Sequence, residues 1–228
     1  MRTKEKLFFA CVLIALVFCQ CTQKVTLKGY MGRYYYHDSL NHVPQVIPGR
    51  LECELYDTGG EGIAFHDSDS INSGSGHLNT ANGTFLNEFR INEPVDISYT
   101  KTNGVDDNPF NYVTPEMGKL YVGWTNLGEW LNYTVEVKKT GKYQIGLLYT
   151  SNQGGEIGLT VDKGSDTLKL QISSTYVKAD TVAWRQWHHW NYIDNLGILE
   201  LTKGVHVLTL STIKNGQMNY NYLEFKLN

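Results

Sequence analysis

Apolar and polar residues alternate in short runs through most of the chain after residue 46, which is typical of half-buried β-strands. The clearest run is 129–137, where every second residue from Leu131 to Val137 is apolar or aromatic. Across KKTGK, residues 143–149 repeat the pattern, so we expect the two runs to form a β-hairpin. No segment beyond residue 20 has the periodicity of a helix.

Further segments of the same kind recur at nearly regular intervals. They are 50–56, 156–162, 166–172, 184–190, 197–210 and 220–227, with Gly or Asn-Gly turns between several. In the first of them, Leu51, Cys53 and Leu55 alternate with polar neighbours. Many short strands joined by turns predict an all-β fold, an antiparallel two-sheet β-sandwich or jelly roll.

The stretch 66–118 differs from the rest of the chain. It surrounds the short strand-like segment VDISY with Gly, Ser, Asn and Asp, which mark long ordered loops. Loops of this length commonly serve a site or a metal.

The N-terminus has the pattern of an export signal. Residues 1–6 carry three basic side chains, and Leu7 to Phe18 is apolar but short for a membrane span. A cysteine at the end of such a run resembles a bacterial lipoprotein site, with Cys19 or Cys21 lipidated; plain secretion is the alternative. We therefore expect an exported protein, secreted or held at the outer membrane or cell surface.

The pattern divides the chain into three parts: a signal segment over 1–21, a linker or tether over 22–47, and a β-sandwich domain over 48–228. With 41% hydrophobic residues the chain can form a sizeable core, and 20 basic against 23 acidic residues leave no basic excess for nucleic acid. Of the four cysteines, Cys11 and Cys19 lie in the signal, and the remaining Cys21 and Cys53 are too few for a disulfide framework. We expect Cys53 to be a small buried residue, with a nucleophilic role as the alternative.

Seven segments occur along the chain in a recognisable order: IPGRLECELYDTGGEGIAFHDSDSINSGSG, FRINEPVDI, YVGWTNLGEWLNYTVEV, GKYQIGLLYTS, WRQW, GVHVLTL and GQMNYNYLEF. From about Ile47 to Asn228 this order resembles family 6 carbohydrate-binding modules. The resemblance implies a β-jelly roll that binds a plant or algal polysaccharide without cleaving it, often beside glycoside hydrolases. GEGIAFHDSD is most similar to modules of marine and gut polysaccharide degraders.

The resemblance also implies a sugar cleft among the loops at one end of the sandwich. A pyranose has C–H groups on its faces and hydroxyls at its rim, so aromatic rings suit the faces and amides or carboxylates suit the rim. The residues that match are Phe65 and Trp184 as clamps, Asp67 as a rim acceptor, and Asn219 as the amide. Phe65 replaces a frequent tyrosine and lacks its hydroxyl.

Each of these residues has a simpler alternative. In a regular strand Trp184 and Trp187 would point to opposite faces, so one would be buried and Trp187 would be the other candidate clamp. Phe65 could be an ordinary core residue. Asn219 could end the turn that follows Asn215-Gly216.

A second set of residues suggests a cation. Glu52 and Glu54 flank Cys53 and would repel each other on one strand face. The resemblance implies a structural Ca²⁺ held by Glu52, Glu54 and Asn221, since hard oxygen ligands suit this ion. An exposed strand edge is the alternative.

Other functions are less well supported by the sequence. A jelly roll of this size could be a small glycoside hydrolase or polysaccharide lyase, but the chain has no H-E-x-x-H or G-x-S-x-G motif. The candidate catalytic residues would be Glu129, Asp106, Asp107 and His66. The tyrosines at 34–36 could instead form a protein-interaction surface. We expect His188 and His189 to be solvated or core side chains, and we expect no catalysis.

Overall fold

A computed structural model of the chain describes residues 27–35, 43–74 and 89–228. The predicted signal segment and both candidate lipidation cysteines lie outside these residues. Within the described ranges, no helix is long and apolar enough to cross a membrane.

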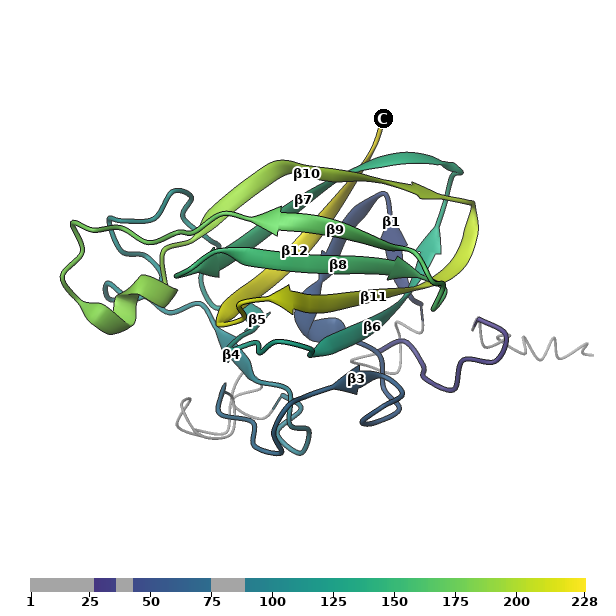
Figure 1. The fold of residues 1–228 in the computed structure, drawn as a ribbon, viewed down its shortest axis with the longest axis horizontal. Helices are drawn as coiled ribbons and strands as arrows, with labels where there is room; N and C mark the ends of the chain where they lie inside the picture. The colour runs from purple at the N-terminus through teal and green to yellow at the C-terminus, as the bar shows by residue number, and fades with distance from the viewer. Residues whose placement is uncertain (1–26, 36–42, 75–88) are drawn as a thin grey trace, which may run out of the picture.

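Two six-stranded sheets face each other, so the predicted all-β sandwich is confirmed (Figure 1). The first sheet has the order β1-β6-β11-β8-β9, and β3 pairs with β6 beside that path. Its strands are β1 (Gln45–Ile47), β3 (Phe65–His66), β6 (Trp130–Val137), β8 (Gly155–Val161), β9 (Thr167–Ile172) and β11 (Gly204–Lys214).

The second sheet has the order β10-β7-β12-β5-β4, and β2 pairs with β12 beside that path. Its strands are β2 (Gly49–Glu52), β4 (Ile97–Tyr99), β5 (Leu120–Val122), β7 (Gly141–Ser151), β10 (Asn191–Leu201) and β12 (Met218–Leu227). All of its pairings are antiparallel, whereas β1 and β6 of the first sheet run parallel.

The core lies between the sheets and is formed by the alternating residues that the sequence predicted. Every second side chain from Leu131 to Val137 is at most 6% exposed, and the same positions from Tyr143 to Tyr149 are fully buried. The pleat sends these side chains to one face, where they pack against each other across the sandwich. The two runs therefore contribute the facing halves of one core.

The predicted hairpin of these two runs is wrong. Strand β6 pairs with β11 in the first sheet, while β7 pairs with β10 and β12 in the second. The three residues between them carry the chain from one sheet to the other. Alternation shows which side of a strand is buried but not which strand lies next to it, so both arrangements fit the sequence equally well.

The strand predicted over 50–56 ends earlier than expected. Strand β2 stops at Glu52, and a 3₁₀ helix, η1 (Cys53–Leu55), follows it. Cys53 is fully buried, as expected, and burial raises the pKa of its thiol well above the usual value. A thiol held in this protonated form is a poor nucleophile, which supports a structural role.

Part of the stretch 22–47 packs against the sandwich. Strand β1 pairs with β6, and the backbones of Arg33 and Thr58 exchange two hydrogen bonds of 2.9 and 2.7 Å. The ring of Tyr35 packs edge-on against Phe89, with 5.3 Å between centroids. Tyr35 thus lies against the domain, and Tyr34 beside it is half-buried.

Two long connections project together from one end of the sandwich, to the left in Figure 1. One joins β4 to β5, and the other joins β9 to β10 and contains the 3₁₀ helix η3 (Ala183–Trp187). We call this the loop end. It carries the residues described next.

Candidate functional site

A cavity of about 220 Å³ opens at the loop end, and three of its five lining residues are tryptophans. The lining residues are Trp124, Trp184, Trp187, His188 and Asn219. They come from the β5–β6 connection, from η3 and the residue after it, and from the start of β12. Three segments far apart in the sequence therefore build one aromatic cavity.

Helix η3 puts two of the tryptophans on the same side. The sequence predicted a strand over 184–190, and this is wrong, because residues 183–187 form a 3₁₀ helix. Side chains at positions i and i+3 of such a helix lie one above the other, so Trp184 and Trp187 both face the cavity. Trp184 is 54% exposed, which leaves a large part of its ring available to a ligand.

A buried ion pair holds η3 in place. The carboxylate of Asp180 accepts hydrogen bonds from Arg185, with Nε at 2.6 Å and Nη2 at 2.8 Å, and from the backbone of Val182. It also contacts Nε2 of the fully buried His189 at 2.8 Å. Hydrogen bonds from Arg185, above all, hold the pKa of Asp180 well below its usual value. His189 is thus a core side chain, one of the two expected outcomes.

Asn219 connects the walls of the cavity. Its Nδ2 donates to the Thr150 hydroxyl and to the backbone carbonyl of Trp187, both at 2.8 Å. Its Oδ1 accepts from the backbone N–H of Trp124 at 3.2 Å. Both amide N–H groups are used inside the protein, so the side chain positions two tryptophans and retains only acceptor capacity for a ligand.

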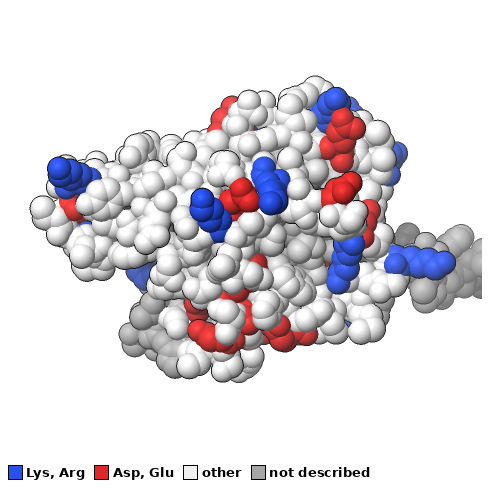
Figure 2. Space-filling model, in the orientation of Figure 1, with Lys and Arg blue, Asp and Glu red and all other residues white. Residues whose placement is uncertain are grey.

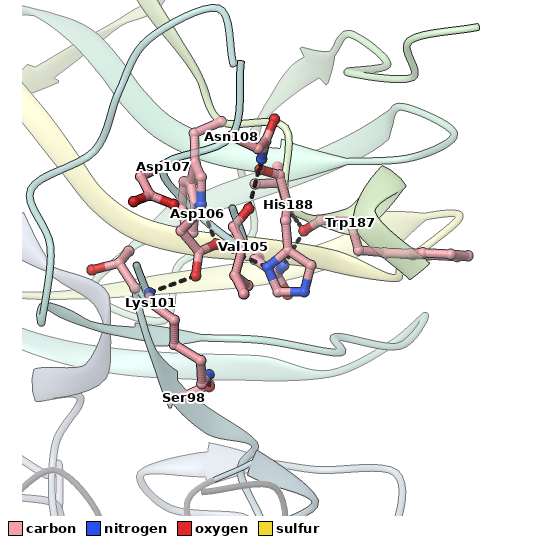
Figure 3. A network of polar contacts seen from close by, with 12 residues as sticks. Ser98, Lys101, Val105, Asp106, Asp107, Asn108, Trp187 and His188 are labelled. Carbon is pink, nitrogen blue, oxygen red and sulfur yellow. Dashed lines mark hydrogen bonds and ion pairs between the residues drawn. The ribbon is translucent and has the colours of Figure 1, made fainter. Parts of the chain in front are cut away.

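His188 is held from behind by a buried carboxylate (Figure 3). Oδ1 of the fully buried Asp106 lies 2.8 Å from His188 Nδ1 and accepts from Trp190 Nε1 at 2.7 Å. Its Oδ2 accepts from the backbone N–H of Lys101 at 2.7 Å. Asn108 donates to the His188 carbonyl at 2.9 Å. The β4–β5 connection therefore fixes the imidazole at the cavity wall.

Comparison with known families decides what kind of domain this is. The family described as carbohydrate binding module (family 6) matches residues 97–227. The chain belongs to this family. It is therefore a carbohydrate-binding module, and the family is non-catalytic. A comparison with curated protein sequences found no match.

Solved structures of other family 6 modules are similar to this one. A module of a marine laminarinase from Zobellia galactanivorans is 22% identical, with 48% of this chain and 81% of that chain covered and a TM-score of 0.40. A module of Cellvibrio mixtus lichenase 5A, solved with cellotriose, is 20% identical, with 59% and 87% covered and a TM-score of 0.43. A β-1,3-glucan-binding module from Bacillus halodurans is 17% identical, with 80% and 98% covered and a TM-score of 0.45.

The structure brings together two of the four residues proposed for sugar binding in this family 6 module. Trp184 and Asn219 line the loop-end cavity, but Phe65 and Asp67 do not. Phe65 is 2% exposed and packs edge-on against Tyr56, 5.5 Å between centroids. It is a core residue, in keeping with the absence of a hydroxyl that would need a partner.

The sequence analysis missed Trp124, which forms another aromatic wall of the cavity. It lies two residues beyond the end of strand β5 and adopts a positive φ of 48°, a conformation that few tryptophans take. A large aromatic residue between Gly123 and the turn-forming Thr-Asn-Leu-Gly was the available signal. Its position beside Asn219 depends on tertiary contacts and could not be read from that signal.

Three of the four residues considered for catalysis hold loops of the module together, and the fourth, His66, contacts the carboxylate of Glu61 at the surface. Glu129 accepts hydrogen bonds from Ser68 and from the backbone N–H of Asn126, which joins two connections. Asp106 anchors His188, and Asp107 accepts from the backbone N–H of Gly104. Their bonds tie loops together, which agrees with the family's lack of catalysis.

A second cavity, of about 230 Å³, lies on the face of the first sheet. Trp130 lines it, together with the polar residues Asn132, Thr160, Lys163, Thr209 and Ser211. It has one tryptophan where the loop-end cavity has three. Trp130→Ala is therefore a suitable comparison for Trp184→Ala.

Asp67 belongs to a group of carboxylates, and Figure 2 shows acidic side chains gathered along the lower edge of the molecule. Asp67, Asp96 and Glu129 line a small cavity of about 20 Å³. Burial, reinforced by the neighbouring carboxylates, raises the pKa of Asp67 and that of Asp96 to about 7. Both side chains therefore hold a proton in the folded protein under mildly acidic conditions.

These raised pKa values predict a module that loses stability as the pH rises from about 4 to about 7. In the unfolded chain an aspartate ionises near pH 3.9, whereas folded Asp67 keeps its proton up to about 7, so the folded state is favoured at the acidic end. Urea unfolding at both ends of this range would measure the loss. Asp67→Asn should reduce this loss of stability, whereas Asp166→Asn, at an exposed site, should lose as much stability as the wild type. An equal loss in all three proteins would contradict the raised pKa of Asp67.

The three residues proposed for Ca²⁺ lie on neighbouring elements. Glu52 pairs with Tyr222 across β2 and β12, which places it beside Asn221. Glu54 is not on the strand face shared with Glu52, as the sequence analysis assumed, because it lies in η1. Burial, and next the charge of Glu52, raise the pKa of Glu54 well above its usual value.

The donor chemistry of this set fits a hard cation. Oε2 of Glu54 is buried and has no hydrogen-bond partner among the described residues. Asn221 donates through Nδ2 to the Leu120 carbonyl at 2.9 Å, so its Oδ1 is left as an acceptor. Within the described ranges, no cluster of three His, Cys, Asp or Glu side chains is arranged to hold a metal. Amide or carbonyl oxygens would have to complete the site.

Proposed function

We propose that the loop-end cavity is the carbohydrate-binding site of this module. The observation that carries the proposal is the convergence of Trp124, Trp184 and Trp187 with Asn219 around one open cavity. Indole rings offer flat apolar faces to the C–H faces of a pyranose, and polar groups at the wall can reach its hydroxyls. This replaces the clamp of Phe65 and Trp184 that the sequence suggested with one built from tryptophans alone.

We propose further that the module holds a plant or algal polysaccharide at the cell surface or close to glycoside hydrolases that act in trans. The apolar N-terminal run with its terminal cysteines supports export and a lipid anchor. Tethering raises the effective concentration of a weak single site, so a modest affinity suffices when many copies share one surface.

The experiment that tests this function is a pull-down of the purified protein with insoluble and arrayed polysaccharides. We expect binding to at least one class of glycan with no release of reducing sugar into the supernatant. Failure to bind any glycan would reject the proposed site and favour a protein-interaction role. Release of oligosaccharide would contradict the non-catalytic assignment.

We also propose a structural Ca²⁺ held by Glu52, Glu54 and Asn221. The orphaned carboxylate oxygen of Glu54 supports this, because burying an ionised carboxylate is costly unless a cation compensates its charge. When bound, the ion would supply that charge and fasten η1 to the last strand.

Calcium is therefore expected to stabilise the module. An ion that binds only the folded state at one hundred times its dissociation constant adds about 2.7 kcal/mol, which corresponds to a rise in Tm of about 5–10 °C. Differential scanning calorimetry with Ca²⁺ and then with EDTA would measure it. Glu54→Gln should lose the response, whereas Glu136→Gln, at a surface ion pair, should keep it. No shift in the wild type would reject the calcium site.

A further inference from the structure

The N-terminal segment meets the sandwich at the end opposite the loop end. Three short connections lie there, on the right in Figure 1: β6–β7 (residues 138–140), β8–β9 (162–166) and β10–β11 (202–203). We call this the turn end. The described segment 27–33 lies beside it, because the ammonium of Lys163 in the β8–β9 connection is 4.9 Å from the ring centroid of Tyr30.

Segment 27–33 is held against the domain. Tyr30 is 9% exposed, and a Cβ on Gly59 would lie only 3.2 Å from the Cα of Gly32, so the two backbones approach closely. The tether predicted over 22–47 is therefore docked over part of its length. At most seven residues separate a lipidated Cys19 or Cys21 from residue 27, and a fully extended chain of that length reaches about 25 Å.

Basic residues outnumber acidic ones at the turn end. The three connections and segment 27–33 contain two acidic residues, Asp162 and Asp166, and six basic ones, Lys28, Arg33, Lys138, Lys139, Lys163 and Lys203. Lys138 pairs with Glu136, whereas the other five are exposed and form no ion pair with any residue of the described ranges. The loop-end connections 100–119, 123–129 and 173–190 contain four basic and five acidic residues. The two ends of the sandwich therefore differ in charge.

The remaining neighbours of segment 27–33 leave this positive charge uncompensated. The β2–β3 connection adds two carboxylates, of which Asp57 is buried and Glu61 contacts His66. Asp162 contacts the imidazole of His206 at 2.8 Å. Met31, between Lys28 and Arg33 in the sequence, is 74% exposed. An apolar side chain flanked by basic ones suits the boundary between anionic headgroups and acyl chains.

We propose that the turn end rests on an anionic lipid surface to which the N-terminus is anchored, so that the loop-end cavity points away from the membrane. This rests on the proposed function, which supplies the lipid anchor. Charges attract headgroups only within about one Debye length, about 8 Å at physiological ionic strength, and the short tether keeps the turn end close enough for such contact. Strands β7 and β11, of 11 residues each, put the loop end about 35 Å farther out.

Hydrogen–deuterium exchange tests this orientation on the unsubstituted protein. The full chain, purified from membranes with its own anchor, is reconstituted into vesicles of phosphatidylcholine with or without phosphatidylglycerol. With phosphatidylglycerol, we expect the amides of 138–140, 162–166 and 202–203 to exchange about threefold more slowly, and those of 173–190 to be unchanged. Salt at about 1 M shortens the Debye length to about 3 Å and should abolish the difference.

Two double variants assign the protection to the basic residues of the turn end. Lys139→Glu with Lys203→Glu reverses two exposed charges there, so the slower exchange should disappear. Lys178→Glu with Lys214→Glu is the matched control, because it makes the same change at two exposed lysines near the other end, outside the cavity lining. It should behave as the wild type. The salt response of the wild type remains a test if a variant does not fold.

The outcomes separate this proposal from sugar binding. Equal protection of both ends, protection of 173–190 alone, or protection that persists in Lys139→Glu with Lys203→Glu overturns the orientation. Stronger protection of the turn end by soluble carrageenan than by vesicles assigns it to an anionic glycan and overturns the lipid assignment. A protein without an acyl group in mass spectrometry that does not float with vesicles overturns the anchor and the orientation together. In each case binding in the polysaccharide pull-down is decided independently.

Discussion

Trp184→Ala is expected to weaken polysaccharide binding by about thirtyfold or more, while the fold remains intact. Tryptophans that anchor a ligand contribute about 2 kcal/mol or more to binding, which corresponds to that factor. Because the side chain is 54% exposed, its removal leaves no cavity in the core, and Tm should change by about 2 °C or less. Affinity electrophoresis and calorimetry on the same preparation would measure both quantities.

Two further variants test whether the loss of binding is specific to the loop-end cavity. Tyr112 is an exposed aromatic residue outside the cavity, 57% exposed, so Tyr112→Ala should bind as the wild type does. Trp130→Ala removes the tryptophan of the sheet-face cavity. If Trp130→Ala abolishes binding and Trp184→Ala does not, the binding site lies on the sheet face and our assignment of the loop end is wrong.

Asp106→Ala is expected to be the most destabilising change at the loop end, at about 3–5 kcal/mol. The buried carboxylate accepts from Lys101, His188 and Trp190, and each donor left without a partner costs about 1–3 kcal/mol. For a chain of this size such a loss lowers Tm by about 10 °C. Polysaccharide binding should fall as well, since the same carboxylate fixes His188 at the cavity.

The neighbouring residue is a suitable control for this variant. Asp107 is exposed and accepts from the backbone of Gly104. Asp107→Ala removes the same charge from the same connection and should change the free energy of unfolding by about 0.5 kcal/mol or less. Urea unfolding of both variants would measure the difference in their free energies of unfolding. Equal stabilities would show that the Asp106 network does not hold the loop end together.

The candidate site could be predicted in part. Trp184 and Asn219 were identified from the order of segments, and both line the cavity. Trp124 was missed because its role depends on Asn219 of the last strand, 95 residues away, which bonds its backbone. Trp187 was assigned to the opposite face because the segment was taken as a strand. The 3₁₀ turn is stabilised by the buried Asp180–Arg185 pair, a contact that alternation does not reveal.

Phe65 shows the opposite error. Its place in a familiar segment suggested a clamp, yet its ring contacts Tyr56 and its strand pairs with β6 at Leu131. A phenylalanine fits either an aromatic clamp or a core, and exposure alone separates the two. Exposure is a property of the surrounding elements rather than of the segment.

The sequence by itself determined that the chain is an all-β sandwich, and it placed the core residues, because the side chains of a strand alternate between two faces and apolar ones must be buried. It also determined the family, because the order of segments persists along the chain. Only the tertiary structure decided which strands pair, that β6 and β7 lie in different sheets, and which aromatic rings meet at the loop end. Pairing and convergence are set by contacts between residues distant in the chain, and such contacts leave no periodic trace in the segments that make them.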